Sequence, residues 1–296
     1  MSSLFITGAT GYVGKRLIAL LDVTRFQHVR CLARTPGPSI PGIQWISGDL
    51  LDPPSYASSL QGCDTVLHLA AVTGKNSPAT FFQVNTQGTR TLLEAARKAG
   101  VRNMLYVSSV AAAFRDQTGY HYGQSKKQAE EIVAAGGLRY IIVRPTMVFG
   151  PRAPVFEGLL KLAGAPAIPV FGNGRAAVQP VYVDDLVQFL LAILEHDFFP
   201  NQIHGAGGPS VLSIEELLIR IRSACLHQPS RIVHVPVGLL LPGLRLFEKF
   251  LLPLLPLTAG QLMSFVNDGV VEATAMRQWV PQPTGLDDML RLSTIS

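Results

Sequence analysis

Residues 5–15 read FITGATGYVGK, and the glycines Gly8, Gly11 and Gly14 follow directly behind a short apolar run. Glycines mark turns in many folds, so the triplet alone identifies no ligand. The same spacing between a strand and a helix lets a backbone approach a diphosphate closely. The segments around this loop therefore decide between a plain turn and a dinucleotide site.

Short runs rich in Val, Ile and Leu alternate with helix-like segments through the first half of the chain. We predict strands at 3–7, 28–33, 43–46, 65–69, 103–108 and 139–144. Helix-like segments lie near 12–22, 53–60, 79–99 and 123–135. Strands without polar alternation are buried on both faces, as in parallel sheets covered by helices. The pattern predicts an α/β protein with a Rossmann-type doubly wound parallel sheet.

The regular alternation of strands and helices ends after Gly150, and Pro and Gly cluster over 150–175. A helix is predicted at 184–196, with two acids at its start, and another at 213–225, where Ser213 and Glu216 form a capping-box pattern. The remainder, 226–296, is Pro- and Leu-rich and is predicted to be irregular. We therefore predict a dinucleotide-binding domain and a smaller C-terminal substrate lobe. The first spans 1–150, with 176–206 returning to it, and the second comprises 151–175 and 207–296.

Composition and charge limit the classes of function. Of 296 residues, 48% are hydrophobic and only 15% are charged, which predicts a compact fold and excludes a disordered chain. The net charge of +5 is mild and its basic residues are scattered, so nucleic acid is not an expected partner. This balance suits an anionic small ligand or an anionic membrane surface.

The cysteines and the apolar segments bear on the cellular compartment and on contact with membranes. Cys31, Cys63 and Cys225 form no CxxC pair, which indicates a reducing, cytoplasmic compartment, and we predict no metal site. The start, MSSLFITG, lacks the pattern of a signal peptide. Segment 235–257 is apolar, but its prolines and three charged residues make it a poor transmembrane helix. It is interpreted as core, a substrate lid or a weak contact with a membrane surface.

The end of the second predicted strand bears on the choice of dinucleotide. An acid that binds a ribose hydroxyl is expected there, but Ala33 and Arg34 occupy the place. A guanidinium matches the geometry of a 2′-phosphate, so Arg34 favours NADP, with NAD left open. The alternative is an ordinary solvated arginine.

A second set of polar residues lies further along the chain. Residues 122–126 read YGQSK, and positions four apart share one face of a helix. Lys126 beside the ring of Tyr122 is expected to lower the pKa of that hydroxyl and make it an acid or base near neutral pH. Ser108 and Ser109 end the fifth predicted strand, at the edge of the sheet where ligands bind.

These motifs occur together and in a fixed order. They are TGATGYVG at 7–14, GDLLD at 48–52, HLAA at 68–71, VNTQGT at 84–89, YVSS at 106–109, YGQSKKQAE at 122–130, VRPTMVFGP at 143–151 and VYVDDL at 181–186. The chain resembles the extended and atypical short-chain dehydrogenases/reductases over roughly its first two-thirds. That superfamily includes sugar-nucleotide epimerases, 3β-hydroxysteroid dehydrogenases and dihydroflavonol-type reductases.

The resemblance implies a role for each matching residue. Tyr122 would be the catalytic acid or base, Lys126 its partner on the nicotinamide ribose, and Ser109, or less favourably Ser108, would orient the substrate oxygen. The implied cofactor contacts are Gly8, Thr10, Gly11, Tyr12, Val13, Gly14, Arg34, Asp49, Leu50, Leu69, Ala70, Ala71, Asn85, Lys126 and Pro145.

Three departures from the family pattern bear on the substrate. Ser109 lies closer to Tyr122 in sequence than is usual in the family. Val178 stands where sugar-nucleotide enzymes carry an arginine towards the diphosphate, although Arg175 could replace it. QPVYVDDL and LPLTAGQLMSFVNDGVV are similar to the branch near the accessory dinucleotide-binding subunit of respiratory complex I.

The leading hypothesis is an NAD(P)-dependent oxidoreductase that moves a hydride between nicotinamide and an apolar carbonyl or alcohol. One alternative is a sugar-nucleotide epimerase or dehydratase with tightly bound NAD. A second is a non-catalytic NADP-binding assembly or lipid-associated protein, and a homodimer is left open.

Overall fold

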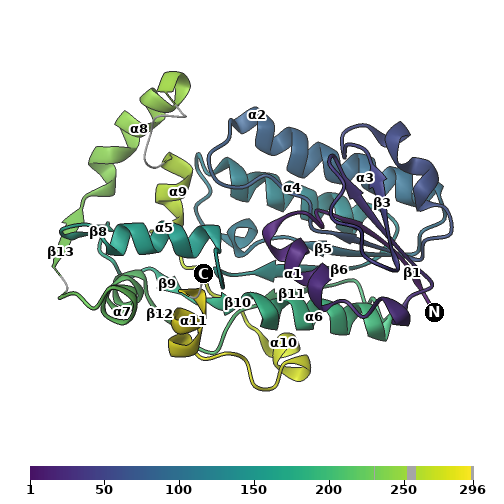
Figure 1. Cartoon of the computed structure of the whole chain (residues 1–296). Helices are drawn as coiled ribbons and strands as arrows, with labels where there is room; N and C mark the ends of the chain where they lie inside the picture. The colour runs from purple at the N-terminus through teal and green to yellow at the C-terminus, as the bar shows by residue number, and fades with distance from the viewer. Residues whose placement is uncertain (230, 252–257, 295–296) are drawn as a thin grey trace.

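The computed structural model describes residues 1–229, 231–251 and 258–294. A seven-stranded parallel sheet forms its centre, in the order β11-β6-β5-β4-β1-β2-β3 (Figure 1). Its strands are β1 (Ser3–Thr7), β2 (His28–Ala33), β3 (Ile43–Ser47), β4 (Thr65–His68), β5 (Asn103–Val107), β6 (Arg139–Pro145) and β11 (Gln202–Ala206). The order reverses between β1 and β4, which is the switch point of a doubly wound sheet. The predicted Rossmann-type fold is confirmed.

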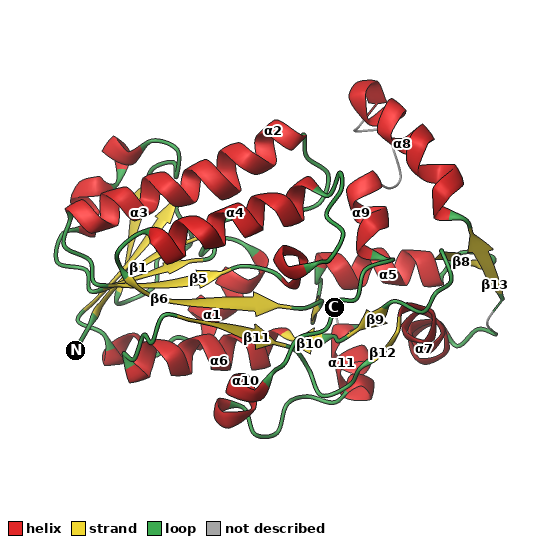
Figure 2. Cartoon of the chain, turned by 180° about the vertical axis from the view of Figure 1, so that it is seen from behind, coloured by secondary structure: helices red, strands yellow, loops and turns green. Residues whose placement is uncertain are grey.

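Helices cover both faces of the sheet (Figures 1 and 2). One face carries α1 (Tyr12–Leu20) and α6 (Val183–His196), and the other carries α2 (Pro78–Phe81), α3 (Gly88–Lys98) and α4 (His121–Ala135). Each layer encloses its own apolar core, so β1 has no exposed residue. This burial on both sides explains why the strands read as continuous apolar runs.

The remaining elements build a lobe with a separate core around Phe149 and Phe156. Its strands are β7 (Val148–Phe149), β8 (Ile168–Phe171), β9 (Ala177–Val178), β10 (Val181–Tyr182), β12 (Leu212–Ser213) and β13 (Ile232–Val235). Its helices are α5 (Pro154–Ala163), α7 (Ile214–Leu226), α8 (Val237–Leu251), α9 (Ala259–Ser264) and α11 (Leu286–Ser293). A further helix, α10 (Thr274–Trp279), packs instead on β11 and α6, where Met276 joins the core of the sheet. The lobe lies beyond the carboxyl ends of the sheet strands, so it faces the edge where ligands bind (Figure 2).

Segment 176–206 connects the lobe with the sheet. Its strand β11 pairs in parallel with β6. Its helix α6 packs beside α1, where Asp184 accepts two hydrogen bonds from Arg16, at 2.5 Å and 2.6 Å. The pair is partly exposed and contributes about 1 kcal/mol at most, so the apolar contacts of α6 carry most of the attachment.

Several predicted elements differ in detail. Segment 53–60 forms two short 3₁₀ helices, Pro53–Ser55 and Ala57–Leu60, in place of the single helix predicted there. A π-helical segment, Phe82–Gln87, divides the helix predicted at 79–99. The capping box at Ser213 is half formed, since Ser213 accepts from the N–H of Glu216 while the Glu216 carboxylate pairs with Arg220.

The prediction that 226–296 is irregular is wrong, because β13 and four helices lie there. Within 235–257, the described part is mainly α8, whose described side chains are half-buried or exposed, and Leu241 packs against a buried cluster. The core, lid and membrane-surface interpretations of this segment therefore stay predictions. The last residues of that segment, 252–257, lie outside the described residues. Across the described ranges, no helix combines the length and apolarity needed to cross a membrane.

Candidate active site

The glycine loop is fixed by backbone contacts that allow no side chain. Gly8 has φ +76°, and a Cβ on it would lie 2.5 Å from the nitrogen of Ala70. A Cβ on Gly14 would lie 2.1 Å from the carbonyl oxygen of Gly8. The loop between β1 and α1 therefore packs directly on the chain that leaves β4, and helix α1 packs directly on the loop.

Gly11 differs from its two neighbours in the motif. A Cβ on Gly11 would meet only the Gly8 oxygen, at 3.2 Å, so the space beside it is open. Gly11 is also the N-cap of α1, whose first N–H groups point out of the helix with Tyr12 and Val13 at its start. Open space in front of a helix N-terminus fits the diphosphate of a dinucleotide. Thr10 borders this space and is exposed.

The side chain of Tyr12 points away from that space. Its hydroxyl is buried with no hydrogen-bond partner among the described residues, and a Cβ on Gly150 would lie 2.5 Å from it. Burial raises the pKa of Tyr12 to about 12. Tyr12 is therefore placed to meet the cofactor with its backbone, while its ring packs towards the lobe.

The expected adenosine contacts lie after β2 and β3. Arg34 follows β2 directly and is exposed. The carboxylate of Asp49 accepts a hydrogen bond from the N–H of Leu51 at 2.8 Å, so it shapes the turn after β3. The side chain of Leu50 is buried against Gly88 of α3, which leaves mainly its backbone for a ligand.

A buried histidine links β1, β4 and α3. His68 Nδ1 is 2.6 Å from Thr7 Oγ1, and its Nε2 is 2.9 Å from Thr89 Oγ1. Burial, and secondarily the charge of Lys126, lower the pKa of His68 to about 3, so the ring is neutral at physiological pH. This network fixes the end of β4, after which Leu69, Ala70 and Ala71 run past the glycine loop. The sequence motif HLAA contained His68, but its role was not predicted.

Asn85 ties this part of the chain to helix α4. Its amide donates to the Val72 carbonyl at 3.1 Å and to Ser125 Oγ at 3.0 Å, and its oxygen accepts from the Val72 N–H at 2.8 Å. Ser125 donates in turn to the carbonyl of Tyr122 at 2.8 Å. Asn85 thus positions the backbone of the Tyr122 turn, which adds a structural role to the cofactor contact that the resemblance implies.

Lys126 lies in the interior at the end of β5. Its Nζ donates to the Val107 carbonyl at 2.9 Å and lies 4.3 Å from the centroid of the Tyr106 ring. Burial lowers the pKa of Lys126 to about 7, and the carboxylate of Glu130 opposes this shift. Glu130 is itself paired with Arg144, at 2.6 Å. Neither Glu130 nor Arg144 was predicted as part of the site.

Tyr122 lies in the first turn of α4, on the same helix as Lys126. Burial raises the pKa of its hydroxyl, and a hydrogen bond with Ser109 opposes the shift. The expectation that Lys126 lowers the pKa of Tyr122 is therefore not met here, because the ammonium group is directed to Val107. Of the two serines, Ser109 reaches Tyr122, whereas the Ser108 hydroxyl is buried without a partner among the described residues.

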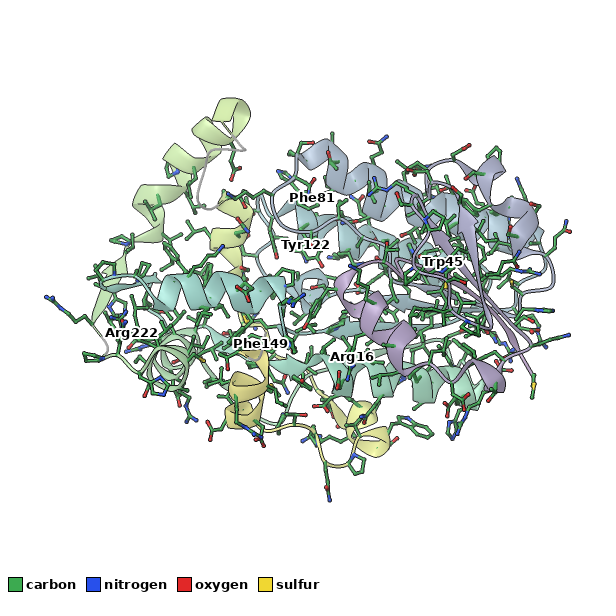
Figure 3. The ribbon with its side chains drawn as sticks, viewed as in Figure 1. Arg16, Trp45, Phe81, Tyr122, Phe149 and Arg222 are labelled. Atoms are coloured by element: carbon green, nitrogen blue, oxygen red, sulfur yellow. The ribbon has the colours of Figure 1, made fainter. Side chains whose placement is uncertain are left out.

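Apolar side chains from distant parts of the chain surround Tyr122. We call Ala111, Phe114, Tyr120, Tyr122, Leu241 and Met263 the Tyr122 cluster. Phe81 of α2 adds a ring whose centroid lies 6.0 Å from that of Tyr122, and Figure 3 shows the two side by side between sheet and lobe. The Tyr120 ring lies at the same distance on another side. The sequence did not predict this cluster, because its members come from four separate segments.

Two further observations concern ligands at this edge of the sheet. Val178 is fully buried in the core of the lobe, while Arg175 is exposed, and Pro145 is buried at the end of β6. Within the described ranges, no group of three or more His, Cys, Asp or Glu side chains is placed to hold a metal ion.

Comparison with known proteins agrees with this geometry. The model of the NAD-dependent epimerase/dehydratase family matches residues 4–204. The chain is 30% identical over 261 residues to N-acetyl-alpha-D-glucosaminyl-diphospho-ditrans,octacis-undecaprenol 4-epimerase of Escherichia coli O157:H7, covering 80% of this chain and 77% of the relative. It is 32% identical over 191 residues to ceramide reductase of Caulobacter vibrioides, covering 63% of this chain and 59% of the relative.

Solved structures show the same fold. UDP-glucuronic acid 4-epimerase from Bacillus cereus, solved with UDP-glucuronic acid and NAD, superposes with a TM-score of 0.75 at 20% identity, covering 99% of this chain and 98% of that one. The chain belongs to the NAD-dependent epimerase/dehydratase family, within the extended short-chain dehydrogenase/reductase superfamily. It is an NAD(P)-dependent enzyme of that family.

The buried Lys126 predicts a specific dependence of stability on pH. An ordinary lysine has a pKa near 10.4, so the folded chain, with its value of about 7, binds fewer protons than the unfolded chain between these limits. The free energy of unfolding should therefore rise with pH in this window, by up to about 1.4 kcal/mol per unit, relative to Lys126→Met. Below pH 7 the difference between the two proteins should be constant.

Urea unfolding at intervals from pH 6 to 10, without added cofactor, measures this difference. Lys127→Met is the matched control, because its side chain is exposed. A difference between wild type and Lys126→Met that stays flat across the window would contradict the assignment.

Proposed function

We propose that this enzyme is an oxidoreductase that acts on an apolar carbonyl or alcohol, with Tyr122 as the proton donor or acceptor. The observation that carries the proposal is the composition of the Tyr122 cluster, in which aromatic and aliphatic side chains pack together with the tyrosine ring. A desolvated surface of this kind favours a hydrocarbon substrate over a sugar, whose hydroxyls need hydrogen-bond partners.

Each polar residue has a place in such a reaction. When bound, the nicotinamide supplies or accepts the hydride. In the direction of reduction, the Tyr122 hydroxyl gives its proton to the substrate oxygen, and Ser109 holds that oxygen by a hydrogen bond. Lys126 would hold the nicotinamide ribose, and its positive charge would then favour the phenolate of Tyr122.

The relatives support an apolar substrate without specifying it. Ceramide is a lipid, and the undecaprenol of the other relative is a long isoprenoid alcohol. Ceramide and the undecaprenol-linked sugar both carry a long hydrocarbon chain. The two enzymes named after them catalyse different reactions at the polar end. We infer that the hydrocarbon lies against the Tyr122 cluster.

A second candidate is epimerisation of a sugar carried on a diphosphate. The 4-epimerase relative and the fold of the UDP-glucuronic acid enzyme favour it. The buried Val178 weighs against it, because no cation stands at that position to bind a diphosphate. Tyr122, Lys126 and Ser109 would serve either reaction.

We propose NADP as the preferred dinucleotide. Arg34 is exposed directly after β2, where a carboxylate would bind the ribose hydroxyl of NAD. A guanidinium is suited to a 2′-phosphate there. The B. cereus structure contains NAD, so this preference is the finer and separate part of the proposal.

The role of Tyr122 predicts the result of a conservative substitution. Tyr122→Phe should lower kcat for NADPH-dependent reduction of ketones by about 10²-fold or more, because the proton donor is lost. Among linear ketones, kcat/KM should rise about three- to fourfold per methylene until the chain fills the cluster, as each buried methylene contributes about 0.8 kcal/mol. The absorbance of NADPH at 340 nm measures the reaction rate in both experiments.

Tyr140→Phe removes the same hydroxyl near the start of β6, away from the cluster, and should retain activity. Equal turnover by Tyr122→Phe would exclude the acid role. A kcat/KM independent of chain length, together with turnover of a diphosphate-linked sugar, would favour the second candidate.

The role of Arg34 predicts a selective change in affinity. Arg34→Ala should weaken NADPH binding about tenfold or more, since a hydrogen bond to a charged group contributes about 1.5–3 kcal/mol, and should leave NADH binding within about twofold. Fluorescence titration measures both dissociation constants. Arg97→Ala, at the far end of α3, is the control. An equal effect of Arg34→Ala on both dinucleotides, or no effect, would refute NADP selection by this residue.

A further inference from the structure

Glu130 is a buried acid on helix α4, one turn beyond Lys126. Its side chain is 6% exposed, and its two carboxylate oxygens accept hydrogen bonds from the guanidinium of Arg144 on β6, at 2.9 Å and 2.6 Å. A buried ion pair often adds no stability over apolar residues of similar volume. The packing of α4 on β6 therefore does not explain by itself why two charges lie at this place.

The Glu130 carboxylate lies close enough to Lys126 to act on its charge. Side chains four positions apart share one face of a helix, with Cβ atoms about 5–6 Å apart. Lys126 is 1% exposed, and its Nζ contacts two uncharged groups, the Val107 carbonyl at 2.9 Å and the Tyr106 ring at 4.3 Å from the centroid. Glu130, whose ion-pair partner is Arg144, therefore acts on Lys126 through space.

The other titratable groups that face Lys126 carry no charge at neutral pH. Burial, and secondarily Lys126 itself, lower the pKa of His68 on β4 to about 3. Burial raises the pKa values of Tyr106 on β5 and of Tyr122 on α4. Of the described groups that act on Lys126, the carboxylate of Glu130 is thus the one that carries a charge.

The two ends of the Glu130–Arg144 pair act differently on Lys126. Burial lowers the pKa of Lys126 to about 7, and the Glu130 carboxylate opposes that shift, whereas the Arg144 guanidinium has no such effect. The negative end of the pair is therefore the nearer one, and Arg144, with a side chain 26% exposed, is the end closer to solvent. Without the carboxylate, burial would leave Lys126 uncharged at neutral pH.

We propose that Glu130 is a positioning residue that extends the charged state of Lys126 up to neutral pH, with Arg144 holding its carboxylate in place. The inference deepens the proposed function and rests on it, because the charge of Lys126 is what would hold the nicotinamide ribose and favour the phenolate of Tyr122. Glu130 acts on the reaction only through Lys126.

Urea unfolding of the full chain from about pH 5 to 10, without cofactor, shows where Lys126 loses its charge. The free energy of unfolding relative to the matching Lys126→Met protein is flat below the folded-state pKa of Lys126 and rises with pH from there to the ordinary value near 10.4. The rise should begin near pH 7 in wild type. In Glu130→Gln it should begin about one pH unit lower, since an opposite charge within about 4–6 Å shifts a pKa by about 1–3 units. Glu131→Gln, at the exposed neighbouring position, is the matched control and should leave the wild-type curve unchanged.

Arg144→Gln separates an effect of charge from a loss of packing. This variant breaks the same ion pair but leaves the carboxylate, so the rise should begin above pH 7. If the pair served only to hold α4 on β6, Glu130→Gln and Arg144→Gln would shift the curve in the same direction or not at all, and either result would overturn the proposal. Should Glu130→Gln alone not fold, Glu130→Gln/Arg144→Gln takes its place, because its two amides can hydrogen-bond to each other, and its rise should still begin below pH 7.

The dissociation constant of NADPH over the same pH range separates this proposal from the proposed function. The ratio of the Glu130→Gln value to the wild-type value should reach about threefold or more between the two pH values at which Lys126 loses its charge, because only wild type then offers a charged donor to the ribose. A ratio that stays at one while the unfolding curves shift would count against Lys126 at the ribose, which belongs to the proposed function, and would leave the effect of Glu130 standing. Unfolding curves that do not shift would overturn the role of Glu130 whatever the ratio.

Discussion

The architecture depends on one close approach of backbone to backbone. Gly8 lies so near Ala70, and Gly14 so near Gly8, that a single Cβ at either position would overlap main-chain atoms. These contacts bring the ends of β1 and β4 and the start of α1 together at the switch point of the sheet. They leave an open space in front of the α1 N-terminus, where N–H groups are free to bind a diphosphate. This space is where we propose that the dinucleotide binds.

Buried hydrogen bonds connect the glycine loop with Tyr122. Thr7, His68 and Thr89 join β1, β4 and α3, and Asn85 continues the connection to Ser125 and the carbonyl of Tyr122. A buried polar group without its partner costs about 1–3 kcal/mol, so these links resist rearrangement. The position of Tyr122 relative to the glycine loop is thus fixed by the core of the sheet.

Much of the sheet and of the polar site could be predicted from the sequence, because both depend on local patterns. Strand 28–33 is read from adjacent residues and lies where predicted. Tyr122 and Lys126 lie on one helix, as their spacing indicates, while their catalytic pairing stays a prediction. The apolar surroundings could not be predicted, since Phe81, Tyr120 and Leu241 meet only through the folded lobe. The direction of the Tyr122 pKa shift was missed because burial raises this pKa, while the Lys126 ammonium is directed to the Val107 carbonyl.

We propose that the glycine loop holds the dinucleotide that reacts at Tyr122. Gly11→Ala tests it most directly, because the added methyl group would meet only one protein atom, at 3.2 Å, and would otherwise enter the space assigned to the diphosphate. Gly158→Ala in α5 is its matched control, since a Cβ there meets nothing within 4 Å. By NADPH titration of folded protein, the account predicts at least about a tenfold weaker affinity for Gly11→Ala and an unchanged one for Gly158→Ala. Wild-type affinity in Gly11→Ala would contradict the account.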